Sequence, residues 1–234
     1  MTLPDILVAV QPTLPYRGLL AELCRVSARV YRSGLSRGTS GNISVRTAEG
    51  MLITPSGLAL DEVAENNVCH VDAQGQTIDG WQTRLPFKPS SEWVIHQALY
   101  HARPDCHAVI HAHSVHATLL AACHQPINRH IIAESAYHLG TVPLVPYTMP
   151  GSHALANEVA HAATDANCLL LANHGVLVLG EDLREAFYRL ELLETIAEMV
   201  YKARLLEQQH GFDMEDLKPQ WLGREEVAAI QALK

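Results

Sequence analysis

The feature that most constrains the fold is an alternation between short apolar runs and longer segments in which apolar residues recur at helical spacing. Short apolar runs bounded by turn residues are typical of strands, and intervals of three and four are typical of helices. Strands that alternate with helices predict an α/β domain. Helical spacing covers Leu19–Tyr31, Glu92–Tyr100, Val115–Ala122, His153–Ala163 and Leu183–Leu206, and strands are expected at Ile43–Val45, Met51–Thr54, Ala108–His111, Val142–Val145 and Cys168–Leu171.

Length and composition favour a single domain. The chain has 234 residues, of which 48% are hydrophobic and 18% are charged, and this is enough to enclose one large core. The sequence contains no linker, repeat, low-complexity tract or block of like charge. We therefore expect one domain over residues 1–234.

Charge and cysteine usage exclude several classes of protein. The formal net charge is −8 without a basic stripe, which argues against nucleic-acid binding. No apolar run approaches eighteen residues and no basic cluster opens the chain, so neither membrane spanning nor secretion is indicated. The five cysteines form an odd set without a Cys-x-x-Cys pair and resemble reduced thiols, which favours a cytoplasmic protein. They are Cys24, Cys69, Cys106, Cys123 and Cys168.

Two histidines end the apolar run Val109-Ile110-His111-Ala112-His113. Side chains alternate between the faces of a strand, so His111 and His113 are expected to point the same way. The chain has 14 histidines, so this pair alone is weak support for a metal site. His174 follows a second apolar run, Cys168–Leu171, and supplies a third imidazole. Three histidines with an open fourth position are typical of catalytic zinc.

Three loops rich in glycine and hydroxyl groups lie beside predicted strands or helix starts. Each could be an ordinary turn or helix cap, or could hold a phosphate through backbone N–H groups and hydroxyls. None matches a nucleotide-binding fingerprint. The loops are Gly38-Thr39-Ser40-Gly41-Asn42, Thr54-Pro55-Ser56-Gly57 and Lys88-Pro89-Ser90-Ser91-Glu92.

These three loops, followed by His111-Ala112-His113-Ser114 and Asn173-His174-Gly175, form an ordered series that resembles the class II aldolase and adducin-head family over roughly residues 16–205. The order and spacing are specific, although each motif alone is weak. The resemblance implies a three-layer α/β/α core with a central mixed, largely antiparallel sheet. It leaves residues 206–234 as a C-terminal helical tail, and it implies a homotetramer with active sites between subunits.

The resemblance also assigns roles to residues. It implies one Zn²⁺ per subunit, or another divalent metal, held by His111, His113 and His174, and it places Glu92 at the acid/base position. The phosphate pocket that it implies consists of Gly41, Asn42, Ser56, Gly57, Ser90 and Ser91.

The implied activity is zinc-dependent aldol cleavage of a phosphorylated ketose such as L-fuculose 1-phosphate, giving dihydroxyacetone phosphate and an aldehyde. Epimerase-type members of the family carry aspartate where this chain has Glu92, which favours an aldolase over a ribulose 5-phosphate 4-epimerase. The open alternatives are a methylthioribulose 1-phosphate dehydratase, an oxo-tetronate 4-phosphate decarboxylase, the less favoured ribulose 5-phosphate 4-epimerase and a non-catalytic adducin-like interaction domain.

One position departs from the aldolase pattern. The family's fuculose-phosphate enzyme uses a tyrosine to protonate the aldehyde oxygen, and Ile132 stands at that place here. Tyr137 and Tyr147 are the possible substitutes, and Glu134 lies near the expected position of the second substrate. The identity of the aldehyde is therefore left open by the sequence.

Overall fold

The computed structural model describes residues 16–78, 87–127, 130–208 and 220–233. Its helices are α1 (Arg17–Arg32), α2 (Trp93–Ala102), α3 (Val115–Ala122), α4 (His153–Ala162), α5 (Leu183–Gln208) and α6 (Arg224–Gln231), with short helical turns η1 (Leu60–Glu62), η2 (Ser135–Leu139) and η3 (Ala163–Asp165). Its strands are β1 (Asn42–Arg46), β2 (Gly50–Ile53), β3 (Cys69–Asp72), β4 (Ala108–Ala112), β5 (Leu144–Val145), β6 (Cys168–Leu171) and β7 (Gly175–Gly180).

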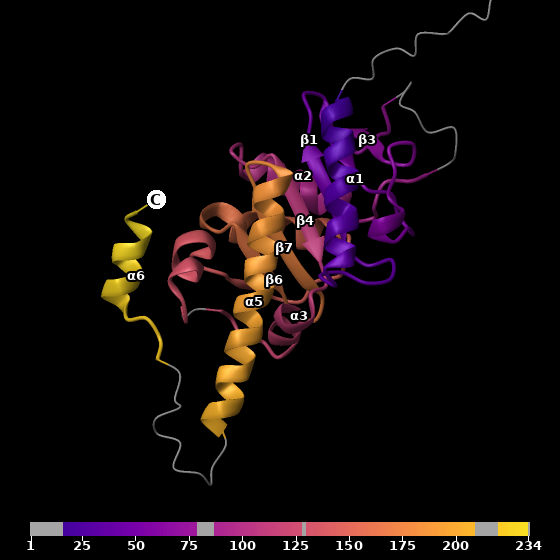
Figure 1. Ribbon diagram of the computed structural model, residues 1–234. Coiled ribbons are helices and arrows are strands. Elements are labelled where there is room, and N and C mark those ends of the chain that lie inside the picture. Colours follow the sequence, from indigo (N-terminus) through magenta and orange to yellow (C-terminus); the bar gives the residue numbers. More distant parts are fainter. Residues whose placement is uncertain (1–15, 79–86, 128–129, 209–219, 234) are drawn as a thin grey trace, which may run out of the picture.

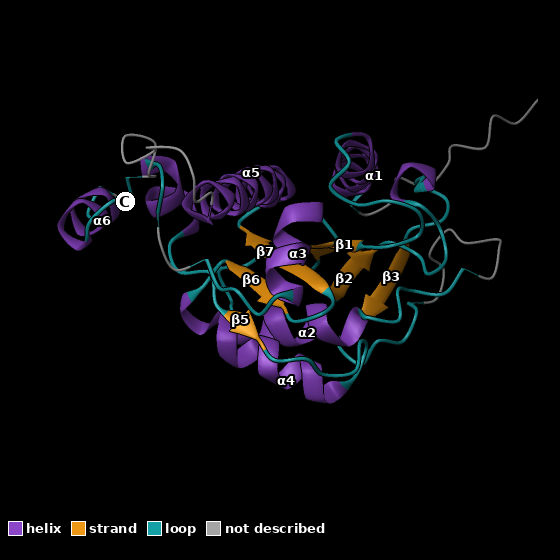
Figure 2. Cartoon of the chain, turned by 90° about the horizontal axis from the view of Figure 1, so that it is seen from below, coloured by secondary structure: helices purple, strands orange, loops and turns teal. Residues whose placement is uncertain are grey.

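The strands form one seven-stranded sheet in the order β3-β2-β1-β4-β7-β6-β5. Neighbouring strands are antiparallel except for the parallel pair of β5 and β6. Helices α1 and α5 cover one face of this sheet, and α2 and α4 cover the other (Figures 1 and 2). The expected three-layer fold with a mixed, largely antiparallel sheet is therefore confirmed.

Two hydrophobic clusters hold the layers together. On the α1 and α5 side, the long helix buries Leu183, Phe187, Leu190, Leu193 and Ala197, each at most 1% exposed, as its spacing predicts. On the other side, α2 and α4 pack against the sheet through a second cluster. Strand β1 divides its side chains between these layers, because alternate residues point to opposite faces.

Two strands and the start of one helix differ from the sequence-based expectation. Strand β7 was not predicted, because all six of its residues are buried and a strand buried on both faces lacks polar alternation. Strand β3 was also missed, whereas helix α6 lies within the tail that was expected to be helical. Helix α2 begins at Trp93, so Glu92 is its N-cap, and no side chain caps this helix end.

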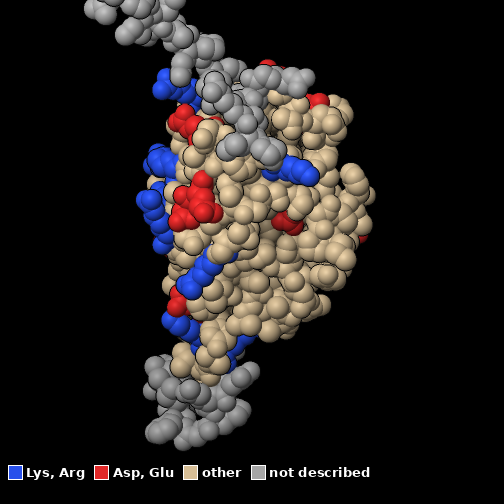
Figure 3. All heavy atoms as spheres, turned by 90° about the vertical axis from the view of Figure 1, so that its right-hand side faces the viewer, with Lys and Arg blue, Asp and Glu red and all other residues tan. Residues whose placement is uncertain are grey.

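The surface is unevenly charged. On the face drawn in Figure 3, Lys, Arg, Asp and Glu gather along one edge, and the broad remainder carries few of them. Among the described helices, none is long and apolar enough to span a membrane.

Candidate metal centre

His111 and His113 converge at the end of the central strand β4. Their Nε2 atoms lie 3.0 Å apart, and the ring centroids are separated by 4.9 Å. The two residues are separated by one position on an extended chain, so their side chains share one side of the sheet. The structure thus confirms the orientation that the His-x-His spacing predicts.

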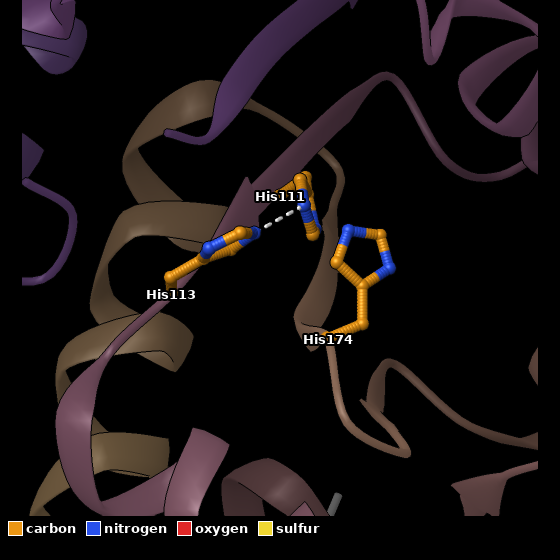
Figure 4. A group of neighbouring side chains, drawn as sticks. All are labelled: His111, His113 and His174. Carbon is orange, nitrogen blue, oxygen red and sulfur yellow. Dashed lines mark hydrogen bonds between the residues drawn. The ribbon is translucent and has the colours of Figure 1, made fainter. Parts of the chain in front are cut away.

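His174 reaches the same place from the turn between β6 and β7. The turn is tight: His174 N donates to Leu171 O over 3.1 Å, and Asn173 adopts a φ of 53°, which asparagine tolerates better than most residues. Strand β7 pairs with β4 through Ala112 and Val176, so the turn lies beside the end of β4. The His174 ring centroid is 4.7 Å from that of His111 and 5.3 Å from that of His113 (Figure 4).

Gly175 permits this close approach. A Cβ atom at residue 175 would lie 2.6 Å from Ala112 O and 2.7 Å from His113 Cδ2. Neither distance is compatible with a side chain unless the strand pair or the imidazole moves. Glycine after the third histidine is therefore a requirement of the packing of the histidines.

The imidazoles are prepared to act as ligands. His111 Nδ1 lies 2.9 Å from Val176 O; a proton on Nδ1 that is donated to this carbonyl leaves the Nε2 lone pair free. Burial lowers the pKa of His111 to about 4 and also lowers the pKa of His113, so both rings are neutral near pH 7. The ligand atoms of the three histidines lie within 4.8 Å of one another.

Glu92 enters the histidine cluster from the start of α2. Its Oε2 lies 3.2 Å from His111 Nε2, and its Oε1 lies 3.3 Å from His174 Nε2. Asn42 Nδ2 donates to Oε2 over 2.8 Å. Burial raises the pKa of Glu92, but His111, His174 and Asn42 outweigh it and hold this pKa well below its ordinary value. The sequence left the sign of this shift open; the structure favours the carboxylate anion.

The site fits a divalent metal. Glu92 Oε1 and His174 Nδ1 are buried, and neither has a hydrogen-bond partner in the described part of the chain. Three imidazoles beside a carboxylate oxygen provide the nitrogen and oxygen donors of a catalytic zinc centre. The donor set thus agrees with the metal expected from the sequence.

A cavity of about 210 Å³ opens beside the histidines. Its lining brings together all six residues expected to bind phosphate, and it also includes Glu92, His113 and His174. Hydrogen bonds join two of its loops, because Ser56 N donates to Lys88 O over 2.8 Å and Ser90 N donates to Thr54 O over 3.1 Å. The complete lining is Thr39, Ser40, Gly41, Asn42, Pro55, Ser56, Gly57, Ser90, Ser91, Glu92, His113, Pro150 and His174.

Among the described residues, the cavity lining has no lysine or arginine. Lys88, which could have supplied a positive charge, is exposed and lies outside the lining. Gly41 has a φ of 82°, and a Cβ there would lie 2.6 Å from Ser36 Oγ and 2.9 Å from His111 O. An anion in this cavity would therefore depend on hydroxyl and backbone N–H donors.

Ile132, the two possible substitutes for the family tyrosine and Glu134 do not join this group. Ile132 is half-buried and Tyr137 is half-buried, Tyr147 is 56% exposed, and Glu134 is exposed. None of the four lines the cavity.

Sequence reasoning missed Pro150 in the lining and also the residues behind Asn42. His96 Nε2 lies 2.5 Å from Asn42 Oδ1, and the His96 side chain is completely buried. A histidine four residues after Glu92 shares its helix face, and this spacing was the one available signal.

Comparisons with known proteins agree with this geometry. The family model for the Class II Aldolase and Adducin N-terminal domain matches residues 21–201. L-fuculose phosphate aldolase of Haemophilus influenzae is 39% identical over 173 residues, which cover 72% of this chain and 76% of that protein. 3-oxo-tetronate 4-phosphate decarboxylase of Escherichia coli K12 is 35% identical over 191 residues, covering 79% and 87%.

A third relative and a solved structure extend the comparison. 5-methylthioribulose-1-phosphate/5-deoxyribulose-1-phosphate aldolase of Escherichia coli O45:K1 is 38% identical over 175 residues, covering 73% of this chain and 77% of that protein. A structure of L-fuculose 1-phosphate aldolase superposes with a TM-score of 0.81 at 29% identity, covering 95% of this chain and 99% of the other.

Proposed function

The chain belongs to the class II aldolase and adducin family and is a lyase of that family, and we propose that it cleaves a carbon–carbon bond in a phosphorylated ketose with the help of a zinc ion. The observation that carries the proposal is a single cavity lined by His113, His174, the Glu92 carboxylate and three hydroxyl-rich loops, with His111 completing the histidine cluster beside it. An aldolase acting on an L-fuculose 1-phosphate-like substrate is the reaction that we favour.

Binding of the substrate's phosphate at one end of the cavity would place its carbonyl group at the other end. Ser56, Ser90 and Ser91, with the backbone of Gly41 and Gly57, would hold the phosphate at the wall of the cavity. His111, His113 and His174 would hold the metal at the other end. A bound divalent ion supplies electrophilic catalysis, polarising the ketone carbonyl and stabilising the negative charge that develops on cleavage.

Glu92 is the proton carrier in this proposal. Its carboxylate removes the proton from the hydroxyl group next to the breaking bond, and the electron pair of that bond passes to the ketone fragment as an enediolate. The aldehyde departs, and Glu92 returns the proton to the enediolate carbon, which gives dihydroxyacetone phosphate. Because the pKa of Glu92 is held low, the residue is ready to accept the proton.

Decarboxylation of an oxo-tetronate 4-phosphate is the second candidate. Loss of CO₂ from such an oxo-acid leaves the same enediolate of dihydroxyacetone phosphate, and no hydroxyl proton has to be exchanged on an aldehyde fragment. Ile132 at the place of the family tyrosine favours this reaction, as does the relative that is 35% identical. The metal and phosphate ends of the cavity serve both reactions.

We also propose that the protein assembles as a homotetramer with neighbouring copies close to the cavity. Apolar side chains within three residues of His113 or Pro150 in the chain are exposed: Val115 is 54% exposed, Tyr147 is 56% exposed and Met149 is 66% exposed. The sparsely charged area in Figure 3 agrees with such a role, because the centres of subunit interfaces are depleted of charge. Light scattering coupled to size-exclusion chromatography tests this, and a mass near the 25.7 kDa of one chain contradicts it.

A phosphorus NMR time course tests the reaction. The zinc-loaded protein is incubated separately with fuculose 1-phosphate, ribulose 5-phosphate, methylthioribulose 1-phosphate and a 3-oxo-tetronate 4-phosphate. Dihydroxyacetone phosphate from a ketose 1-phosphate supports the aldolase, and its release from the oxo-acid alone supports the decarboxylase. A zinc-loaded protein that changes none of them contradicts the proposed function.

A further inference from the structure

A chain of polar side chains runs from Glu92 into the space between β1 and α2. Its members alternate between the two elements in the order Glu92, Asn42, His96, Ser44 and Tyr100. The helix contributes every fourth residue and the strand contributes every second, so each set shares one face of its element. Ser44 and His96 are fully buried, and Asn42 and Tyr100 are only 5% and 6% exposed.

The hydrogen bonds along this chain are short and continuous. Asn42 Nδ2 lies 2.8 Å from Glu92 Oε2, and Asn42 Oδ1 lies 2.5 Å from His96 Nε2. Ser44 Oγ then lies 2.7 Å from His96 Nδ1.

Tyr100 completes the chain. Its hydroxyl oxygen lies 2.7 Å from Ser44 Oγ, whereas the carbonyl of His107, its other contact, is 3.5 Å away. The hydroxyl of Tyr100 is thus held chiefly by Ser44.

The direction of the hydrogen bonds follows from the amide of Asn42. Its NH₂ group donates to Glu92 Oε2, and its carbonyl oxygen, which can only accept, faces His96. His96 therefore carries its proton on Nε2 and accepts on Nδ1. The Ser44 hydroxyl donates to Nδ1 and accepts from Tyr100. Burial lowers the pKa of His96 to about 3, in keeping with a neutral ring that has one donor and one acceptor.

We propose that His96 is a positioning residue that orients Glu92 through Asn42. The two ends of an amide have nearly the same shape, so packing alone does not choose between them. The His96 Nε2–H selects the orientation in which the Asn42 NH₂ group meets the carboxylate. Ser44 and Tyr100 act one step further out, because they hold His96 in the tautomer that donates from Nε2. This inference rests on the proposed role of Glu92 as proton carrier.

The Asn42 contact matters because two imidazoles compete for the same carboxylate. His111 and His174 approach Glu92 to 3.2 Å and 3.3 Å. A carboxylate that loses its Asn42 donor is oriented by these histidines alone, away from the geometry that the proton transfer needs. The expected consequence is a lower kcat with little change in the binding of the phosphate.

Kinetics of three variants of the zinc-loaded full chain test the proposal. H96L removes the donor; we expect kcat to fall about 10- to 100-fold, as for residues that orient catalytic groups, with a KM and a zinc content close to the wild-type values. H96Q retains an N–H donor of similar reach, so we expect it to recover most of the lost kcat. H101L, at an exposed histidine on the same helix, is the matched control and should behave as wild type.

Other results overturn the proposal. A wild-type kcat in H96L would remove the positioning role and leave the proposed function intact. Equal losses of kcat, zinc and thermal stability in both H96L and H96Q would show that His96 is only a packing residue.

Nitrogen NMR of histidine-labelled wild-type protein provides a readout that needs neither turnover nor a folded H96L. We expect the proton of His96 on Nε2, with Nδ1 accepting. A proton on Nδ1 overturns the proposed chain. If the wild-type protein converts none of the sugar phosphates, the proposed function fails, and the NMR result still decides the direction of this chain.

Discussion

The two sides of the cavity differ in how firmly their side chains are held in place. The side formed by β1, β4, the β6–β7 turn and the start of α2 consists of side chains fixed by strand pairing and hydrogen bonds. The other side includes Pro150, and the chain just before it carries Tyr147 and Met149, which are 56% and 66% exposed. The residues proposed for activation of the ketone thus belong to the rigid side. The exposed side is where we expect substrates to be distinguished.

Replacing Glu92 gives the largest expected effect, because it removes the proton carrier from the rigid side. We expect E92Q to lower kcat by about 10²- to 10⁴-fold, the usual contribution of general acid–base catalysis. The zinc content should remain near one per chain, since the three histidines are retained. Steady-state kinetics and metal analysis of the same sample provide the check. Retained activity would exclude Glu92 as the proton carrier.

Gly175 tests whether the rigid side depends on close packing. In G175A the added Cβ would meet Ala112 O at 2.6 Å, so the strand pair or His113 must shift. We expect the variant to lose about 1–3 kcal/mol of stability, as overpacked sites do, and to bind zinc at least about tenfold more weakly, or about 1.4 kcal/mol. Thermal unfolding and zinc titration measure the two effects.

Gly18 is the matched control for that substitution. A Cβ at Gly18 meets nothing within 4 Å, and the residue lies in α1 far from the histidines in sequence. G18A should therefore keep its zinc affinity. Equal behaviour of G175A and G18A would contradict the packing requirement.

The phosphate end should respond through KM. Removal of the hydroxyls in the double variant S90A/S91A should raise the KM for a phosphorylated substrate by at least about tenfold, about 1.4 kcal/mol. Zinc content should not change, because neither serine is adjacent to a metal-binding histidine in the sequence or forms a hydrogen bond with one. An unchanged KM would remove Ser90 and Ser91 from the phosphate pocket.

The smallest effect is expected on the exposed side. Tyr147 does not line the cavity of its own chain, so Y147F should change kcat by less than about threefold, far below the range for a proton donor. A larger fall in kcat, with KM for the phosphorylated substrate unchanged, would instead identify Tyr147 as the replacement for the family tyrosine.

Local sequence patterns predicted much of the fold. Helix α3 and strand β6 have the bounds that spacing predicts, because an apolar run or a helical face identifies them without reference to the rest of the chain. Strand β7 was missed, because it is apolar throughout and only its pairing between β4 and β6 identifies it as a separate strand.

The candidate site, like the fold, was predictable where local sequence patterns define it. His111 lies near the end of strand β4 and His113 follows the strand on the same extended segment, so alternation alone places them together, and the ordered motifs brought in His174 and Glu92. His96 was missed because its contact with Asn42 joins residues 54 positions apart and depends on the packing of α2 against β1. Contacts of this kind are set by tertiary structure, and no local pattern encodes them.

Metal stoichiometry tests the central claim most directly. Purified full-length wild-type protein and H174A are dialysed against zinc and then against metal-free buffer, and the zinc retained per folded chain is measured. The account predicts close to one zinc per wild-type chain and a large loss in H174A. A folded wild-type protein that takes up no zinc, or an H174A protein that retains as much as the wild type, would contradict it.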